Sequence, residues 1–369
     1  MVWTVPQHSR GEVDRAGETL VRIPRMFSDV AEHGGDFDDV IAQAERAFSV
    51  INNWRSSHSY PLQAIKMTLL TRAKRVDSQA IIAQRLKRLS SIELKLRRIE
   101  GMKLSRMHDL GGCRAVLRSP RSVNELVEIY EKAAAKNPHD RPAFVRKYDY
   151  VSDPKTDGYR SVHLVYFYQT RAETKIIYNG LRIEIQLRSR LQHAWATAVE
   201  TVSSFTGQAL KSNVEDIADE GWRRFFALMG SAIAIREGTP PIPNTPTGAE
   251  LKQQLQEYAQ RLDITNRLQL YGAALQALPA PDIPADAYYV LLELDLAKLQ
   301  ITVKHYKENE LDRASSDYLA VEKAAAEKKG EARDAVLVSV DSMANLRRAY
   351  PNYFLDTRVF VDAVQKAIQ

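Results

Sequence analysis

The sequence predicts an α+β protein built on a mixed β-sheet, and three observations lead to this prediction. Segments with helical spacing of apolar residues alternate with short segments rich in β-branched and aromatic residues over the 369 residues of the chain. Asn179-Gly180 separates two of the short segments, which is a strong signal for an antiparallel hairpin. The single cysteine, Cys113, excludes a disulfide framework and a cysteine-based zinc site within the chain. Helices mixed with partly antiparallel strands around an apolar core are typical of α+β domains.

Within the first hundred residues, two segments show helical spacing of apolar residues. Residues 1–36 show no clear period, whereas apolar residues recur at helical spacing over 37–54. Pro61 ends a helix or begins the next one, and 62–69 fits either a short strand or a helix. Residues 80–99 predict one basic amphipathic helix, because seven apolar side chains fall on one side of it.

The remaining elements divide the chain into three parts. Strands are expected over 109–117, 144–150, 162–168, 174–178 and 181–187, and helices over 123–136, 190–202 and 214–236. Residues 237–248 hold four prolines and two glycines, the composition of a linker. Beyond it we expect a helix over 250–278, a hairpin of 288–296 and 299–306, a helix over 309–329, a strand over 335–340, and short helices over 342–349 and 357–368. The predicted parts are a first domain (1–237), a linker with a connecting helix (238–278) and a small C-terminal domain (279–369).

Composition and charge indicate an ordinary soluble protein, and the mildly basic balance allows an anionic partner without requiring one. The chain is 44% apolar and 27% charged, with a net charge of +6. No signal peptide or apolar span is visible, so we expect a cytoplasmic protein with no membrane partner. Over 72–106 there are eleven Lys and Arg against three acids. Such a segment suits polyphosphate or nucleic acid, although a solvated helix face would show the same composition.

Residues 148–163, YDYVSDPKTDGYRSVH, predict a polar loop that leads into a strand. Lys155 and Arg160 in this loop have the charge to bind phosphate, and Tyr159 has the ring to stack on a base. An ordinary surface hairpin would have the same residue types.

Two carboxylates from different strands predict a magnesium-dependent phosphate chemistry. Asp109 lies at a turn before a strand, and Glu184, Gln186 and Arg188 alternate with apolar residues, so they share one face. Mg²⁺ binds one or two carboxylates together with phosphate oxygens, and cationic side chains neutralise the transferring group. Purely structural roles are also compatible with these residues, for instance Asp109 as a turn cap and His163 as a packed histidine.

Four ordered segments together resemble the synthetase domain of the RelA/SpoT family. They are TRAKRVDSQAIIAQRLKR, MHDLGGCR, YDYVSDPKTDGYRSVH and IEIQLRSRLQHAWATAVE, and the resemblance covers roughly 66–200. It implies an enzyme that transfers the β,γ-pyrophosphate of ATP to a ribose 3′-hydroxyl. It also implies a synthetase without a hydrolase domain.

The resemblance implies a role for each matching residue. Asp109 and Glu184 would hold Mg²⁺, with Glu184 also the base for the 3′-hydroxyl. ATP binding falls to Arg72, Lys74, Arg85 and Arg114, with Arg118 or Arg121 as the partner of Arg72 around adenine. Acceptor binding falls to Lys155, Tyr159, Arg160, His163, Gln186 and Arg188. The family usually has asparagine where Asp157 stands in this chain.

The C-terminal third resembles the fused antitoxin domain of the CapRel toxins, which looks like a zinc finger without its cysteines. The similar segments are YYVLLELDL and DAVLVSVDSMANLRRAYPNYFLDT. The resemblance implies that Tyr350 and Tyr353 enter the ATP site and block it, although they could merely cover a helix end. It further implies a toxin that pyrophosphorylates the 3′-CCA end of tRNA, with a phage protein as the trigger that releases the block. Two alternatives stay open: a small alarmone synthetase acting on GDP, GTP or adenosine nucleotides, and a non-catalytic regulator that binds RNA or nucleotides.

Overall fold

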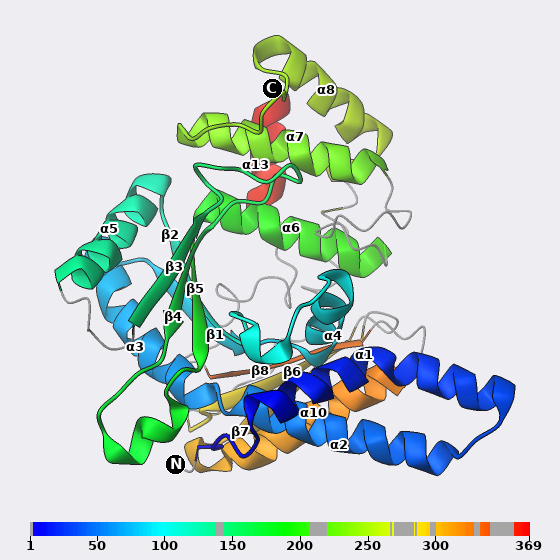
Figure 1. Cartoon of the computed structure of the whole chain (residues 1–369). Helices are drawn as coiled ribbons and strands as arrows, with labels where there is room; N and C mark the ends of the chain where they lie inside the picture. Colours follow the sequence, from blue (N-terminus) through cyan, green and yellow to red (C-terminus); the bar gives the residue numbers. More distant parts are fainter. Residues whose placement is uncertain are drawn as a thin grey trace.

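The computed structural model describes residues 3–136, 143–206, 220–265, 268, 284, 286–295, 300–327, 333–339 and 358–369. Its largest feature is a mixed sheet with helices on both sides, and a smaller sheet lies near its β1 edge (Figure 1). The predicted fold class, α+β with a mixed sheet, is confirmed. Within the described residues, none of the helices combines the length and apolar character needed to cross a membrane.

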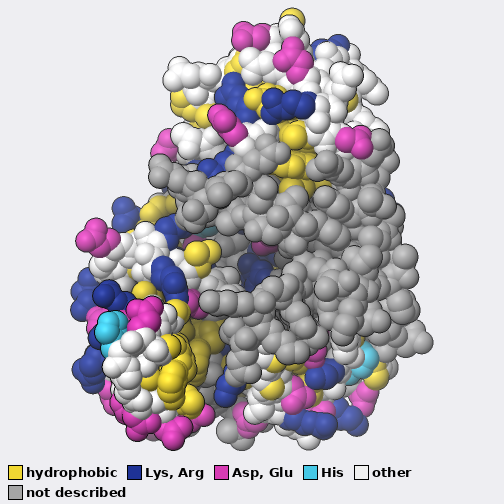
Figure 2. Space-filling view, turned by 90° about the vertical axis from the view of Figure 1, so that its right-hand side faces the viewer, with side chains coloured by type: hydrophobic (Ala, Val, Ile, Leu, Met, Phe, Trp, Pro, Cys, Tyr) yellow, Lys and Arg dark blue, Asp and Glu magenta, His cyan; other side chains and the backbone are white. Residues whose placement is uncertain are grey.

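The chain begins with an antiparallel pair of long helices, α1 (Arg10–His33) and α2 (Phe37–Ser56). The absence of structure expected over 1–36 is wrong. Ser9 and Glu12 form a reciprocal capping box that starts α1, and Val13 and Leu20 lie in the buried stripe of the helix. The free end of this pair faces the viewer at the lower left of Figure 2, where apolar side chains border acidic ones.

The main sheet has the order β1-β2-β5-β4-β3. Its strands are β1 (Ile81–Leu86), β2 (Gly111–Leu117), β3 (Ala143–Asp149), β4 (Val162–Phe167) and β5 (Arg182–Ser189). β2 and β5 run parallel, and every other neighbouring pair is antiparallel. The strands expected around 109–117, 144–150 and 162–168 are therefore confirmed.

The single helix expected over 80–99 is wrong. Residues Ile81–Leu86 form β1, which pairs with β2, and only Leu89–Arg98 form a helix, α4. The segment holds so many apolar residues that a helical period of 3.6 residues fits it as well, which led to the wrong prediction. Pairing with β2 decides the outcome, because it satisfies the backbone groups of the edge strand.

The hairpin expected at Asn179-Gly180 is also wrong. Residues Glu173–Tyr178 form a 3-10 helix, and β5 hydrogen-bonds to β4 on one side and β2 on the other. A strand at 174–178 would have no free edge of β5 to pair with. The antiparallel hairpin is formed instead by β3 and β4, on either side of the polar loop.

The two faces of the sheet are covered by different helices. α3 (Ser59–Val76) and α5 (Pro120–Lys136) pack on one face, and α4 and α6 (Arg190–Thr206) lie on the other side of it (Figure 1). The first face is apolar, because alternate residues of the central strands, such as Leu164 and Ile185, point into a shared core with α3 and α5. Pro61 lies in the first turn of α3, so 62–69 is helical.

Four helices form a second core at the end of the sheet where α6 begins. They are α6, α7 (Glu220–Glu237), α8 (Gly248–Arg261) and α13 (Arg358–Ile368). α8 ends at Arg261, so it is shorter than the helix expected over 250–278. The C-terminal helix α13 thus packs with helices of the first predicted domain, although it is more than a hundred residues away in the sequence.

The smaller sheet has the order β7-β6-β8, formed by β6 (Tyr289–Asp295), β7 (Gln300–Tyr306) and β8 (Arg333–Ser339). The predicted hairpin is confirmed by β6 and β7, and α10 (Leu311–Glu327) confirms the predicted charged helix. This unit packs beside β1, and the Arg55 guanidinium of α2 lies 4.4 Å above the ring centre of Tyr318. The helix expected over 342–349 lies outside the described residues.

Candidate functional site

The face of the main sheet opposite the α3 and α5 core is polar. Gln186 of β5 stands directly opposite Arg114 of β2 and His163 of β4, so these three side chains project on the same face. Glu184 and Arg188 lie two residues either side of Gln186 and share that face. The sequence alternation in 181–187 therefore predicted this polar row correctly.

Hydrogen bonds connect four of these side chains with one another and with Tyr159 of the preceding loop. His163 Nδ1 lies 2.9 Å from Glu184 Oε1, and His163 Nε2 lies 2.9 Å from the hydroxyl of Tyr159. Gln186 Nε2 donates to Glu184 Oε2 at 2.7 Å. Arg188 donates to the Tyr159 hydroxyl at 2.5 Å and to Gln186 Oε1 at 2.9 Å. Both oxygens of Glu184 are thus held, which fixes the orientation of the carboxylate.

This network sets the protonation states of its members. Burial alone would lower the pKa of His163, but Tyr159 and Glu184 raise the pKa of this imidazole to about 9. Burial would raise the pKa of Glu184, yet the charge and hydrogen bond of His163 keep the pKa of this carboxyl below its ordinary value. Burial would likewise raise the pKa of Tyr159, but Arg188 and His163 lower the pKa of this phenol to about 8. At neutral pH His163 is a cation that donates from both ring nitrogens, and Glu184 is ionised.

Asp109 is held by two lysines that the sequence analysis did not assign. Lys87 Nζ lies 2.8 Å from one carboxylate oxygen and Lys95 Nζ lies 2.9 Å from the other. Burial alone would raise the pKa of Asp109, but these two ammonium groups hold the pKa of this carboxyl far below its usual range. Lys87 follows β1 and Lys95 lies on α4, and both ammonium groups reach the same carboxylate. The single helix predicted over 80–99 gave no reason to expect these two contacts. Ile81–Leu86 reads IIAQRL, which does not alternate between apolar and polar residues, so the local sequence gave no signal for this strand.

The two carboxylates fit a magnesium ion that is shared with a polyphosphate. They interact, since the charge of Asp109 raises the pKa of Glu184. Within the described residues, no three His, Cys, Asp or Glu side chains gather in a way that could hold a metal by themselves. Two ionised carboxylates suit Mg²⁺, which usually takes one or two carboxylates and completes its shell with phosphate oxygens and water.

The loop between β3 and β4 is built around Tyr159. Lys155 Nζ lies 4.2 Å from the ring centre of Tyr150 and 5.0 Å from that of Tyr159. Asp157 Oδ1 accepts a hydrogen bond from the backbone N–H of Tyr159 at 2.8 Å. Asparagine has the same acceptor, so the departure of Asp157 from the family pattern preserves this turn.

Arg160 is not brought into the polar row. Its side chain is 2% exposed and donates to the backbone carbonyl of Val151 at 3.2 Å, away from His163. Burial lowers the pKa of this guanidinium to about 10. The geometry gives Arg160 a contact inside the loop, whereas the sequence analysis expected a contact with the acceptor.

The residues expected to bind ATP fall into two groups. Arg85 and Arg114 belong to β1 and β2, and Arg85 faces Gly112 across the strand pair, so both lie on the polar face. Arg72 and Lys74 lie on α3, which packs on the opposite face. There Arg72 sits 4.5 Å above the Tyr130 ring and Lys74 donates to the Ser78 carbonyl. The structure therefore does not bring Arg72 and Lys74 together with Asp109.

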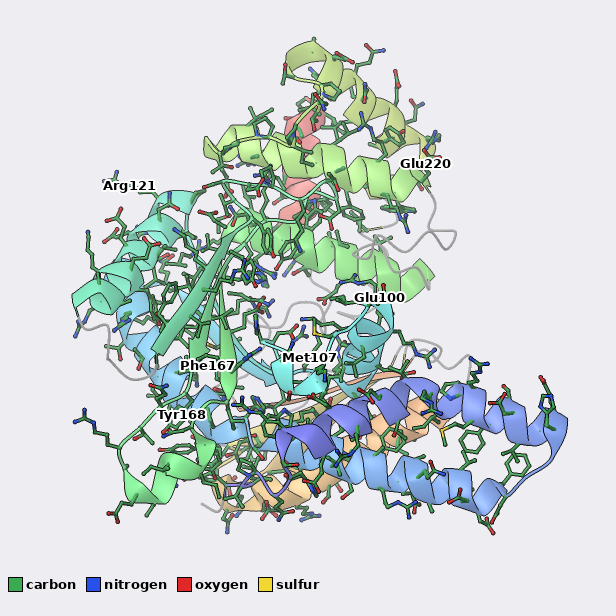
Figure 3. The ribbon with its side chains drawn as sticks, viewed as in Figure 1. Glu100, Met107, Arg121, Phe167, Tyr168 and Glu220 are labelled. Atoms are coloured by element: carbon green, nitrogen blue, oxygen red, sulfur yellow. The ribbon has the colours of Figure 1, made fainter. Side chains whose placement is uncertain are left out.

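Two further predicted positions have other surroundings. Arg118 pairs with Asp77 at 3.5 Å, and Arg121 lies in the first turn of α5, at the upper left of Figure 3. In the same view Met107, two residues before Asp109, lies next to α4, and Phe167 marks the end of β4 remote from the Tyr159 loop. Tyr350 and Tyr353 lie outside the described residues, so their predicted contact with the ATP site stays a prediction.

The fold and the site define an α+β domain whose mixed sheet carries a row of polar side chains and two ionised carboxylates on one face. Residues 84–206 match the family described as the region found in RelA and SpoT proteins. This part of the chain is therefore similar to that region, as the four motifs predicted. The likeness of the C-terminal third to CapRel stays a prediction.

Individual relatives are similar over part of their length. GTP pyrophosphokinase YwaC of Bacillus subtilis is 28% identical over 91 residues, which are 25% of this chain and 40% of that protein. The structure is similar to that of small alarmone synthetase 1 from Bacillus subtilis bound to its product pppGpp, with 19% identity, a TM-score of 0.41, and 49% of this chain and 89% of that chain covered. A GTP pyrophosphokinase family protein from Streptococcus pneumoniae has 24% identity and a TM-score of 0.36, over 48% of this chain and 83% of that chain.

Proposed function

We propose that this chain transfers the β,γ-pyrophosphate of ATP to the 3′-hydroxyl of an acceptor in a magnesium-dependent reaction. The observation that carries the proposal is the fixed, ionised carboxylate of Glu184, which shares the polar face with cations and interacts with the lysine-paired Asp109. Opposed anionic and cationic groups of this kind bind a metal–polyphosphate and stabilise charge that develops during transfer.

Each residue of the site has a distinct part in this reaction. Asp109 and Glu184 would hold Mg²⁺, which would supply positive charge to neutralise the phosphates of ATP. Lys87 and Lys95 lie beside Asp109 and would offer their ammonium groups to phosphate oxygens. Glu184 would accept the proton of the attacking hydroxyl, and the His163 cation would keep the carboxylate oriented.

Tyr159 is the proposed contact for the acceptor base. Its hydroxyl is tied to His163 and Arg188, so the ring is held in place before any acceptor arrives. A fixed aromatic ring is a suitable platform for stacking of a base of any sequence. Lys155 above the ring offers a cation for the acceptor phosphate.

The acceptor that we favour is the 3′-CCA end of tRNA, which would make the chain a toxin that inhibits translation. The support is the likeness of the C-terminal third to CapRel, with Tyr350 and Tyr353 as an autoinhibitory plug and a phage protein as the trigger. The basic segment over 72–106 was expected to lie largely on one helix. It is instead divided between α3, β1 and α4, so its positive charges are not gathered on a single helix face. The second candidate is a small alarmone synthetase, which the name of the relative YwaC, a GTP pyrophosphokinase, favours.

The test uses the full chain carrying Tyr350→Ala and Tyr353→Ala, because truncation would remove α13 from the α6–α8 core. Purified protein receives Mg²⁺, γ-labelled ATP and, in parallel, deacylated tRNA, GDP, GTP or AMP. Label on the tRNA 3′ end supports the toxin, and label on a free nucleotide alone supports the alarmone synthetase. Glu184→Gln in the same background is the control. Absence of Glu184-dependent transfer to every acceptor would overturn the proposed activity and leave the non-catalytic regulator.

A further inference from the structure

We propose that Phe360, on the C-terminal helix α13, is a positioning residue for the acceptor side of the site. It acts through Phe226 and Trp195, which connect it to the ring of Tyr159. The assignment of Tyr159 to acceptor binding rests on the proposed function, whereas the ring contacts between Phe360 and Tyr159 are independent of it. The inference makes the last helix of the chain part of the support of the Tyr159 loop.

Three consecutive ring contacts carry the inference. The Phe360 ring stacks on Phe226 of α7, with centres 5.6 Å apart and an angle of 28° between the planes. Phe226 meets Trp195 of α6 edge to face at 5.9 Å, and Trp195 meets Tyr159 edge to face at 6.4 Å. Phe360 is 0% exposed, so its whole ring is held by this core. Aromatic pairs of this geometry are favourable beyond their burial, and close packing transmits a shift of one ring to the next.

Backbone contacts fasten the same loop to the same residues. Trp195 Nε1 donates to the Phe226 carbonyl at 2.8 Å in a buried hydrogen bond. Gly158 packs against that carbonyl so closely that a Cβ on Gly158 would lie 2.9 Å from the oxygen and 3.0 Å from the Trp195 ring. Gly230 of α7 meets the loop in the same way, since its Cβ would lie 2.7 Å from Gly158 Cα. The backbone of the loop thus packs directly against the backbone of α7. A movement of Phe226 would therefore displace Gly158 and Tyr159.

The connection joins parts of the chain that are distant in the sequence. Phe360 lies on α13, whereas Tyr159 lies in the loop between β3 and β4. The packing of α13 would therefore influence acceptor binding.

The test compares Phe360→Leu with Val364→Ala in the full chain carrying Tyr350→Ala and Tyr353→Ala. Both positions lie on α13 and are 0% exposed, but only Phe360 stacks on Phe226. Leucine keeps an apolar side chain of similar volume, so the variant is expected to fold. We expect hydrogen exchange of residues 150–161 to accelerate about tenfold in Phe360→Leu and less than about twofold in Val364→Ala. The KM for the acceptor should rise about fivefold in Phe360→Leu while the KM for ATP stays within about twofold.

Two results would overturn the proposal. One is equal exchange of 150–161 in both variants, or no acceleration in either, which would reduce Phe360 to general packing. The other is an equal rise of both KM values. If the two residues act along one route, Trp195→Phe and Phe360→Leu together should accelerate exchange by less than the product of their separate effects, and fully additive effects on the free energy would contradict the route. Exchange is measured without turnover, so a chain that fails the labelled-ATP test still decides this inference.

Discussion

His163 Nδ1 lies 2.9 Å from Oε1 of Glu184, and both residues are largely buried on the polar face of the main sheet. The pair is ionic, because the pKa of His163 is raised to about 9 while the pKa of Glu184 is lowered. An ion pair in this position has a directional role, since the imidazolium holds one carboxylate oxygen and Gln186 holds the other.

Glu184→Gln should reduce pyrophosphate transfer by about 10²–10⁴-fold with little loss of folding, because glutamine keeps the shape but cannot accept a proton. Loss of the charge also removes a cause of the raised pKa of His163, so the pKa of His163 should fall. Single-turnover transfer and NMR titration of the imidazole measure the two effects. Glu128→Gln, at an exposed residue of α5 that pairs with Lys132, is the matched control and should change neither.

Lys87→Met and Lys95→Met should each raise the pKa of Asp109 toward its ordinary value, because each removes an ion pair of this carboxyl. If the two lysines transfer their charge to phosphate, the KM for ATP should also rise by about tenfold or more. Steady-state kinetics at saturating acceptor tests this. A KM for ATP that is unchanged in both variants would restrict the lysines to a structural role.

His58 makes the fold sensitive to mild acid. It is 1% exposed, and burial lowers its pKa to about 4 although its Nδ1 bonds the Trp54 carbonyl at 2.8 Å. The unfolded chain binds a proton here below about pH 6.5, whereas the folded chain does so only near pH 4. The stability from neutral His58 is therefore complete above pH 6.5 and is lost as pH falls toward 4, at a cost of roughly 3 kcal/mol.

Urea unfolding between pH 4 and pH 7 measures this dependence. His58→Gln should flatten the decrease in unfolding free energy over that range, since glutamine does not titrate there. A decrease of the same steepness in the variant would assign the acid sensitivity to other groups.

The contact between Arg55 and Tyr318 should help to fix the small C-terminal sheet unit against α2. The guanidinium lies 4.4 Å above the ring centre, and Arg55 is 3% exposed, so the interaction is desolvated. Tyr318→Leu should destabilise the chain by about 1–2 kcal/mol, and Tyr318→Phe by less, because phenylalanine keeps the ring. A double-mutant cycle with Arg55→Leu, followed by thermal unfolding, isolates the pair energy. A coupling energy near zero would contradict the prediction.

Gly230→Ala should destabilise the Tyr159 loop. Its Cβ would lie 2.7 Å from Gly158 Cα and 2.8 Å from the Gly158 carbonyl oxygen, and both are backbone atoms that cannot rotate away. A cost of about 1–3 kcal/mol is expected from overpacking of this kind. Gly11→Ala, in the first turn of α1 with 3.6 Å to its nearest neighbour, is the matched control and should be neutral or stabilising. Equal unfolding midpoints for the two variants would show that the loop adjusts freely.

Features that depend on short-range pattern could be predicted from the sequence. The alternation around Glu184 and Gln186 placed both on one face, and the composition of the Tyr159 loop predicted a turn that enters a strand. These predictions succeed because side chains alternate with a period of two along a strand, whatever pairs with it. The motif order in turn predicted the similarity to RelA and SpoT proteins, and residues 84–206 match the region found in those proteins.

Contacts between distant segments could not be predicted in this way. Residues 81–86 became a strand because β2 offered an edge, and this placed Lys87 and Lys95 on Asp109 instead of on one helix face. Residues 174–178 could not become a strand because β2 and β4 already occupy both edges of β5. α13 joined the α6–α8 core because its apolar stripe needs a complementary surface, and nothing in its local sequence specifies which one. Burial and pairing free energies depend on such partners, so local period alone does not fix them.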